Sequence, residues 1–151
     1  MMLYLFLVSW GAYAQHDKMV MFKDKKVGAA YDQYIRLKDA FVASNADEAK
    51  KAAVDLQKLL GSLNNGKKAA EEAAKIESSS DIKEQRKAFG ALSDEVSTLV
   101  KNEKLSGGII YLEYCPMANG GSYWLSNEKE IKNPYFGDRM LKCGSVKETI
   151  Q

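Results

Sequence analysis

The sequence predicts a mostly helical α+β protein, in which an up-down bundle of three to four helices precedes a small C-terminal tail with a β-hairpin. Between residues 27 and 102, apolar side chains recur at three- and four-residue steps, the spacing of one helix face. After Ser106-Gly107-Gly108 this period ends, and branched and aromatic residues lie between Gly-rich turns, as in strands. With 151 residues, 46% hydrophobic and 28% charged, the composition is that of one globular domain.

The first 14 residues are uncharged and mostly apolar, and Ala12-Tyr13-Ala14 has the small-residue pattern of a cleavage site. We therefore expect a signal peptide over residues 1–14 and a periplasmic or otherwise exported protein. No Lys or Arg precedes the apolar run, so the true translation start stays open, and a buried N-terminal helix or strand is the alternative. We expect no membrane span after signal cleavage, because no later apolar run is long enough.

Residues 15–26 are polar, and we expect a flexible N-terminal segment there. This segment holds the single histidine, His16, with Met19 and Met21. The spacing could capture copper, or it could be a chance feature of a loose exported N-terminus. Residues 27–151 then form a single domain, divided into a helical bundle over 27–104 and a Cys- and Met-bearing β tail over 105–151.

Four segments carry a helical apolar stripe: 27–44, 46–63, 67–77 and 82–102. Asn45 and Asp81 each precede such a segment and are followed three residues later by Glu48 and Glu84, the pattern of a capping box. Asn64-Asn65-Gly66 predicts a helix stop. Short connections favour antiparallel neighbours, so an up-down bundle with a purely apolar core is the expected arrangement.

In the tail, residues 109–114 predict a strand that is covered on both faces. Asn119-Gly120-Gly121 predicts a turn, and residues 122–126 predict the returning strand of a hairpin with Cys115-Pro116-Met117 near its tip. Residues 133–137 predict a tight aromatic turn, and residues 145–150 could add a last short strand.

Four sulfur-bearing residues of the tail are the candidate metal ligands: Cys115, Met117, Met140 and Cys143. Thiolate and thioether are the soft ligands that select Cu(I), which makes Cu(I) the possible cofactor. Alternatively, the two cysteines form a disulfide, which stabilises a domain by roughly 3–4 kcal/mol for a loop of this length, and the methionines fill the core. A reversible switch between the two states also remains open.

Other function classes have little support in the sequence. We expect no enzyme, because a Ser/His/Asp set has only the N-terminal His16 to draw on. The formal net charge of +2 comes from mixed charges, 22 basic against 20 acidic, so no nucleic-acid surface is predicted. A structural zinc site normally needs four Cys or His ligands.

Several motifs of the tail point to a known family; they are Tyr114-Cys115-Pro116-Met117-Ala118, Gly121-Ser122-Tyr123-Trp124-Leu125-Ser126, Lys129-Glu130-Ile131-Lys132-Asn133-Pro134-Tyr135-Phe136-Gly137 and Met140-Leu141-x-Cys143-Gly144. With the first-helix pattern from Tyr34 to Ala40, they resemble a bacterial domain-of-unknown-function family. That family occurs as small exported proteins, or fused C-terminally to the membrane-fusion adaptor subunits of copper/silver efflux pumps. The resemblance implies metal handling in the periplasm, with an efflux adaptor or another exported metal-handling protein as partner.

Two functions are therefore expected, from different classes. The first is a soft-metal-binding protein for Cu(I) or Ag(I), linked to heavy-metal efflux, with the methionine sulfurs within about 4–5 Å of the cysteine sulfurs. The second is a protein-interaction domain with a structural Cys115–Cys143 disulfide. It predicts methionines turned away from the cysteines and an exposed aromatic patch; its members are Tyr123, Trp124, Tyr135 and Phe136.

Overall fold

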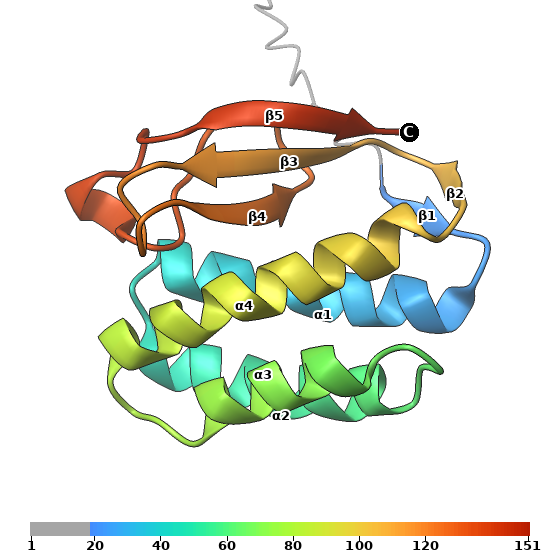
Figure 1. Cartoon of the computed structure of the whole chain (residues 1–151), viewed down its shortest axis with the longest axis horizontal. Helices are drawn as coiled ribbons and strands as arrows, with labels where there is room; N and C mark the ends of the chain where they lie inside the picture. Colours follow the sequence, from blue (N-terminus) through green and yellow to red (C-terminus); the bar gives the residue numbers. More distant parts are fainter. Residues whose placement is uncertain (1–18) are drawn as a thin grey trace, which may run out of the picture.

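The computed structural model describes residues 19–151. The proposed signal peptide and His16 lie outside the described residues. Four helices, α1 (Lys25–Val42), α2 (Ala46–Gly61), α3 (Lys67–Glu77) and α4 (Ile82–Lys101), are followed by a small antiparallel sheet. The fold is therefore α+β, as the sequence predicted. Figure 1 shows three layers, with the sheet on one side, α1 and α4 in the middle, and α2 and α3 on the other side.

Side-chain caps set the helix boundaries. The Asn45 carboxamide oxygen accepts a hydrogen bond from the Glu48 amide at 3.0 Å, and the Asp81 carboxylate accepts one from the Lys83 amide at 2.8 Å. Asp24 caps α1 in the same way, with the Lys26 amide at 2.8 Å, so this helix begins two residues before the predicted start. Each cap satisfies a backbone N–H group that a helix start leaves without a partner.

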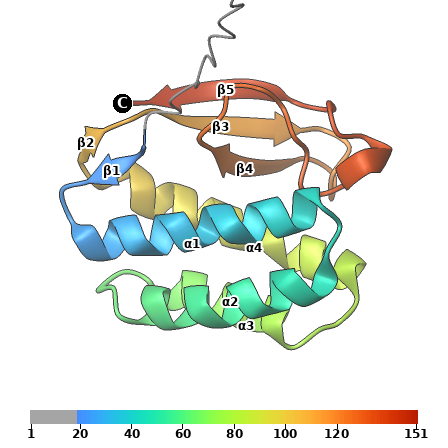
Figure 2. The ribbon, with the colours of Figure 1, turned by 180° about the vertical axis from the view of Figure 1, so that it is seen from behind.

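The sheet has the strand order β4-β3-β5, and all of its pairs are antiparallel. Strand β3 (Ile110–Cys115) lies in the centre, between β4 (Ser122–Ser126) and β5 (Ser145–Ile150). The hairpin predicted from the sequence is thus β3–β4, and the expected last strand pairs with the other edge of β3. Seen from both sides, β4 is the strand nearest the helices (Figures 1 and 2).

The start of the described chain corrects one expectation. Residues 15–26 were expected to be flexible, but Met21–Phe22 form strand β1, which pairs with β2 (Leu105–Gly107). Val20 and Phe22 are buried, and the Phe22 ring lies 5.5 Å from that of Tyr31. Phe22 packs on α1, and the burial of both apolar side chains holds the segment in place. The polar residues around them suggested a loose segment instead.

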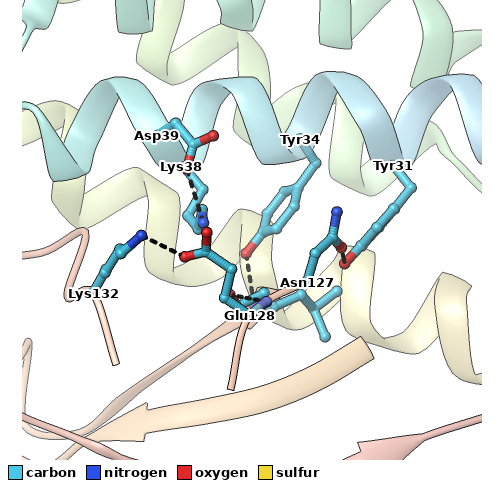
Figure 3. A network of polar contacts seen from close by, with 9 residues as sticks. Tyr31, Tyr34, Lys38, Asp39, Asn127, Glu128 and Lys132 are labelled. Atoms are coloured by element: carbon cyan, nitrogen blue, oxygen red, sulfur yellow. Dashed lines mark hydrogen bonds and ion pairs between the residues drawn. The ribbon is translucent and has the colours of Figure 1, made fainter. Parts of the chain in front are cut away.

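One hydrophobic core joins the bundle to the tail. Phe89 of α4 packs between the rings of Tyr34 and Phe41 of α1, and its centroid lies 5.6 Å from that of Tyr135 in the tail. Polar contacts reinforce the junction: Tyr34 Oη accepts a hydrogen bond from the Leu125 amide at 3.1 Å, and Tyr31 Oη donates to Asn127 at 2.6 Å (Figure 3). The tail is therefore part of the same domain as the bundle.

Candidate functional site

The two cysteines lie side by side at one end of the sheet. Cys115 is the last residue of β3, and Cys143 lies two residues before the start of β5. Because β3 and β5 are neighbours, with Tyr114 opposite Ser145, the chain brings the two sulfurs to 3.2 Å from each other. Cys115 is buried, Cys143 is half-buried, and both are free thiols. This pair can lose two electrons and two protons to form a disulfide, or lose protons to a soft metal ion.

The protonation state of the pair follows from its own geometry. The hydrogen bond with Cys115 raises the pKa of Cys143, and burial and the neighbouring sulfur raise it further. A thiol with a raised pKa is protonated at neutral pH and reacts slowly as a nucleophile. A metal ion bound here must therefore displace protons, and its apparent affinity must increase with pH.

The two methionines occupy different surroundings. Met117 is 64% exposed and lines a groove with Arg86 and Phe136, and neither cysteine is among the residues that line this groove. Met140 is 36% exposed, and its carbonyl accepts a hydrogen bond from the Cys143 amide at 3.0 Å. Of the four sulfur atoms predicted as ligands, the structure thus brings the two cysteine sulfurs into contact with each other.

Asn133 holds the Cys143 segment in place. Its side chain is fully buried; the amide donates to the Cys143 carbonyl at 2.8 Å, and the oxygen accepts from the Tyr135 amide at 2.8 Å and the Phe136 amide at 3.3 Å. The Asn133 backbone amide also bonds the Leu141 carbonyl at 2.8 Å. The predicted aromatic turn is thus an Asn-Pro turn, and the side chain of its Asn133 also bonds the segment that carries Cys143. The Asn-Pro dipeptide signals such a turn, but not its second partner.

Arg86 is a second residue that the sequence analysis missed. It is 8% exposed, its Nε donates to the Pro134 carbonyl at 2.8 Å, and its Nη2 donates to the Phe41 carbonyl at 2.7 Å and to Ser44 Oγ at 3.0 Å. This guanidinium therefore ties α4 to the end of α1 and to the aromatic turn. A signal was present, because position 86 falls within the apolar stripe of its helix, between Ile82 and Phe89.

Glu113, in the middle strand, is a buried carboxyl group without a hydrogen bond. It is fully buried, both of its carboxyl oxygens lack partners, and so does Nε1 of Trp124, its partner across the β3–β4 pair. Burial raises the pKa of Glu113 to about 8, although Lys38 and Trp124 act in the opposite direction. Lys38 is also buried, and its Nζ lies 2.8 Å from the Asp39 carboxylate (Figure 3). Glu113 is therefore held in its neutral form at neutral pH.

The exposed aromatic patch predicted for an interaction domain is wrong for two of its members. Trp124 is fully buried and Tyr135 is 4% exposed, because each ring packs on the other at 6.0 Å and Tyr135 also contacts Phe89. Tyr123 is 38% exposed, and Phe136 is half-buried beside Met117 in the groove.

Comparison with known proteins identifies the family. The family described as "Protein of unknown function (DUF3347)" matches residues 30–108, just over half of the chain. The chain belongs to this family. The match extends from α1 to β2, so the bundle carries it and the two cysteines lie beyond it. No curated protein and no solved structure matches the chain.

The DUF3347 match confirms the expectation of a domain of unknown function, and its fusion to efflux adaptors stays a prediction. Within residues 19–151, no group of three or more His, Cys, Asp or Glu side chains is placed to hold a metal ion. Over the same residues, every helix is too short or too polar to cross a membrane.

Proposed function

We propose that this DUF3347 protein is an exported metal-handling module that binds Cu(I) or Ag(I) through Cys115 and Cys143. The observation that carries the proposal is the distance of 3.2 Å between the two sulfurs. Two thiolates suit a soft monovalent cation, which accepts a low coordination number. Zn²⁺ is disfavoured, because a closed structural zinc site needs four ligands.

The exposure of the pair suits uptake and release of an ion. Cys143 is half-buried, so an ion can reach its sulfur from solvent, while the buried Cys115 offers the second thiolate from the end of β3. Met117 and Met140 are both exposed and have flexible side chains, so either thioether could supply a third ligand to the ion. A partner of the proposed function is a heavy-metal efflux adaptor or another exported metal-handling protein.

The second candidate function is a protein-interaction domain in which Cys115 and Cys143 form a structural disulfide. The exposed position of Met117, in a groove that neither cysteine lines, favours this function. The disulfide would link the central strand to the segment before β5 and stabilise the domain by roughly 3–4 kcal/mol. We propose that the protein is exported, and the oxidising environment outside the cytoplasm permits such a disulfide.

Anaerobic titration of the reduced full chain with Cu(I), against a competing chelator, tests the metal site. We expect one ion per chain, and we expect Cys143→Ser to abolish chelator-competitive binding because a single thiolate remains. A Met117→Leu/Met140→Leu double variant is the matched test of the thioethers: unchanged affinity means a two-thiolate site, and weaker affinity adds a methionine ligand. If the wild type does not compete with the chelator, the metal proposal is wrong.

A thiol titration of the same full chain tests the second candidate, the structural disulfide. Protein recovered from an oxidising compartment is titrated for free thiols before and after reduction. Loss of both thiols, combined with no Cu(I) binding after reduction, supports the structural disulfide. Retention of both thiols under these conditions contradicts it, because sulfurs this close should oxidise.

A further inference from the structure

A groove lined by Met117 has a chemistry that neither metal binding nor the disulfide uses. It has a volume of about 520 Å³ and lies where the start of α4, the loop after β3 and the turn before the 3₁₀ helix η1 (Gly137–Arg139) meet. We call it the Met117 groove; the residues that define its chemistry are Lys83, Arg86, Met117, Tyr135, Phe136 and Arg139. Its volume is within the range of ligand-binding pockets.

The charge in the Met117 groove is all positive. Lys83, Arg86 and Arg139 line it, and no Asp or Glu is among its lining residues. Glu84 and Asp138 are close in sequence, but they do not line the groove. In the described part of the chain, the ion pairs use other lysines, so all three cations lack a carboxylate within salt-bridge distance.

Of the three cations, Arg86 is the most buried. The residue as a whole is 8% exposed, and the three hydrogen bonds of its guanidinium go to neutral oxygens through Nε and Nη2. Burial lowers the pKa of Arg86, and the nearby Arg139 lowers it further through like-charge repulsion. A buried charge is normally compensated by an opposite charge, and here the second charge nearby has the same sign.

Apolar surface accompanies these cations. Met117 exposes 64% of its surface, Phe136 lies beside it, and the Arg139 guanidinium sits 5.7 Å from the centre of the Phe136 ring. Methionine, aromatic residues and arginine are enriched in the cores of protein–protein interfaces, whereas Asp and Glu are depleted there. A flexible thioether also adapts to differently shaped partners.

A second groove on the same molecule shows that volume alone does not produce this chemistry. The groove between α3 and α4 has about 510 Å³, but its charges balance, with Glu72 and Glu84 against Lys75 and Lys87. Its apolar lining consists of alanine. It therefore serves as an internal control for the Met117 groove.

We propose that the Met117 groove binds a segment of a partner protein that combines a carboxylate with a large apolar side chain. The carboxylate accepts hydrogen bonds from Arg139, whose guanidinium can donate two in parallel, and from Nη1 of Arg86, whose Nε and Nη2 already bond protein oxygens. The apolar side chain packs on Met117 and Phe136. Nucleic acid fits less well, because the basic residues elsewhere are balanced by acidic ones. The inference deepens the interaction-domain candidate and requires no metal.

An array of decapeptides tests the composition that the groove selects. Four classes are compared on the metal-free full chain: acidic with apolar residues, basic with apolar residues, acidic with polar residues, and uncharged with apolar residues. We expect the acidic–apolar class to bind, and its amide resonance shifts in NMR spectra to centre on Met117, Ala118 and Phe136. An even response across the four classes would overturn the proposal.

Charge-reversal variants then locate the binding. Arg139→Glu and Met117→Asp should each weaken an acidic–apolar peptide by at least about tenfold, as loss of an interface hot spot does. Lys87→Glu makes the same charge change in the control groove and should leave binding unchanged. A lysine-bearing version of the peptide should bind Arg139→Glu better than the wild type, a gain that misfolding cannot produce.

Equal binding by wild type and Arg139→Glu would contradict the proposed site. This outcome is independent of the metal site, because the peptide experiment contains no metal and leaves both cysteines intact. Loss of Cu(I) binding in Cys143→Ser, with peptide binding retained, would separate the two functions.

Discussion

Replacing Glu113 by Gln should remove a strong dependence of stability on pH. The carboxyl group is fully buried without a hydrogen bond, and burial raises its pKa from 4.5 to about 8. Because the folded-state pKa exceeds the unfolded one, the folded protein keeps a proton that the unfolded chain has lost between these two values. The free energy of unfolding therefore falls as pH rises through this window, and it levels off above the folded-state pKa.

The size of this effect follows from the two pKa values. The interval from 4.5 to about 8, at 1.36 kcal/mol per pH unit, corresponds to about 5 kcal/mol of stability that the wild type loses on ionising Glu113. Glutamine has the same shape and does not titrate in this range. The Glu113→Gln variant should therefore match the wild type at low pH and exceed its stability above the folded-state pKa by a few kcal/mol.

Urea unfolding followed by far-UV circular dichroism, between about pH 5 and about pH 9, measures the effect. The exposed helix residue Glu71 supplies a control, since Glu71→Gln removes a carboxylate without changing a buried group. The reasoning is refuted if wild-type stability stays level over this range. It is also refuted if Glu113→Gln is several kcal/mol less stable at neutral pH, because the carboxylate would then be ionised and paired with the buried Lys38.

Three further substitutions test the contacts that hold the tail. Asn133→Ala removes the side-chain bonds to the Cys143 carbonyl and to two amides of the aromatic turn, and urea unfolding should show a loss of about 2–4 kcal/mol; a loss below that of an exposed Asn→Ala change would contradict this role. Gly137→Ala adds a side chain at φ +56°, against Ser44 and Arg86, and should lower the melting temperature, with a loss of about 1–3 kcal/mol; Gly61→Ala, where an added methyl meets no atom, is its control. Tyr34→Phe deletes the hydroxyl that bonds Ser93 at 2.8 Å and the Leu125 amide at 3.1 Å, and should cost about 1–3 kcal/mol in urea and speed hydrogen exchange of the Leu125 amide; unchanged exchange there would refute the bond.

Local patterns in the sequence were sufficient for the bundle. The helical segments carry apolar residues at helical spacing, and α2, α3 and α4 begin directly after Asn45, Gly66 and Asp81. Predicted and observed helices therefore agree within two residues at each end. The hairpin β3–β4 was equally local, because a Gly-rich turn separates two β-branched and aromatic runs. These features depend on contacts between residues that are near each other in the chain.

Strand β1 and the strand order were not predictable in this way. Strand β1 is only Met21–Phe22, and it pairs with Leu105–Gly107 more than eighty positions later. The pairing of β5 with β3 is likewise non-local, since residues 127–144, which include the aromatic turn, lie between the sheet strands β4 and β5. No periodicity within such short segments specifies a distant partner.

The sequence alone determined the fold class, the helix boundaries and the identity of the sulfur-bearing residues, because these depend on local propensity and composition. Only the tertiary structure decided that Cys115 meets Cys143, that Met117 faces a cationic groove, and that Glu113 and Arg86 are buried. The physical reason is that burial and proximity arise when the β4-β3-β5 sheet packs on α1 and α4, and they depend on pairings between residues far apart in the chain.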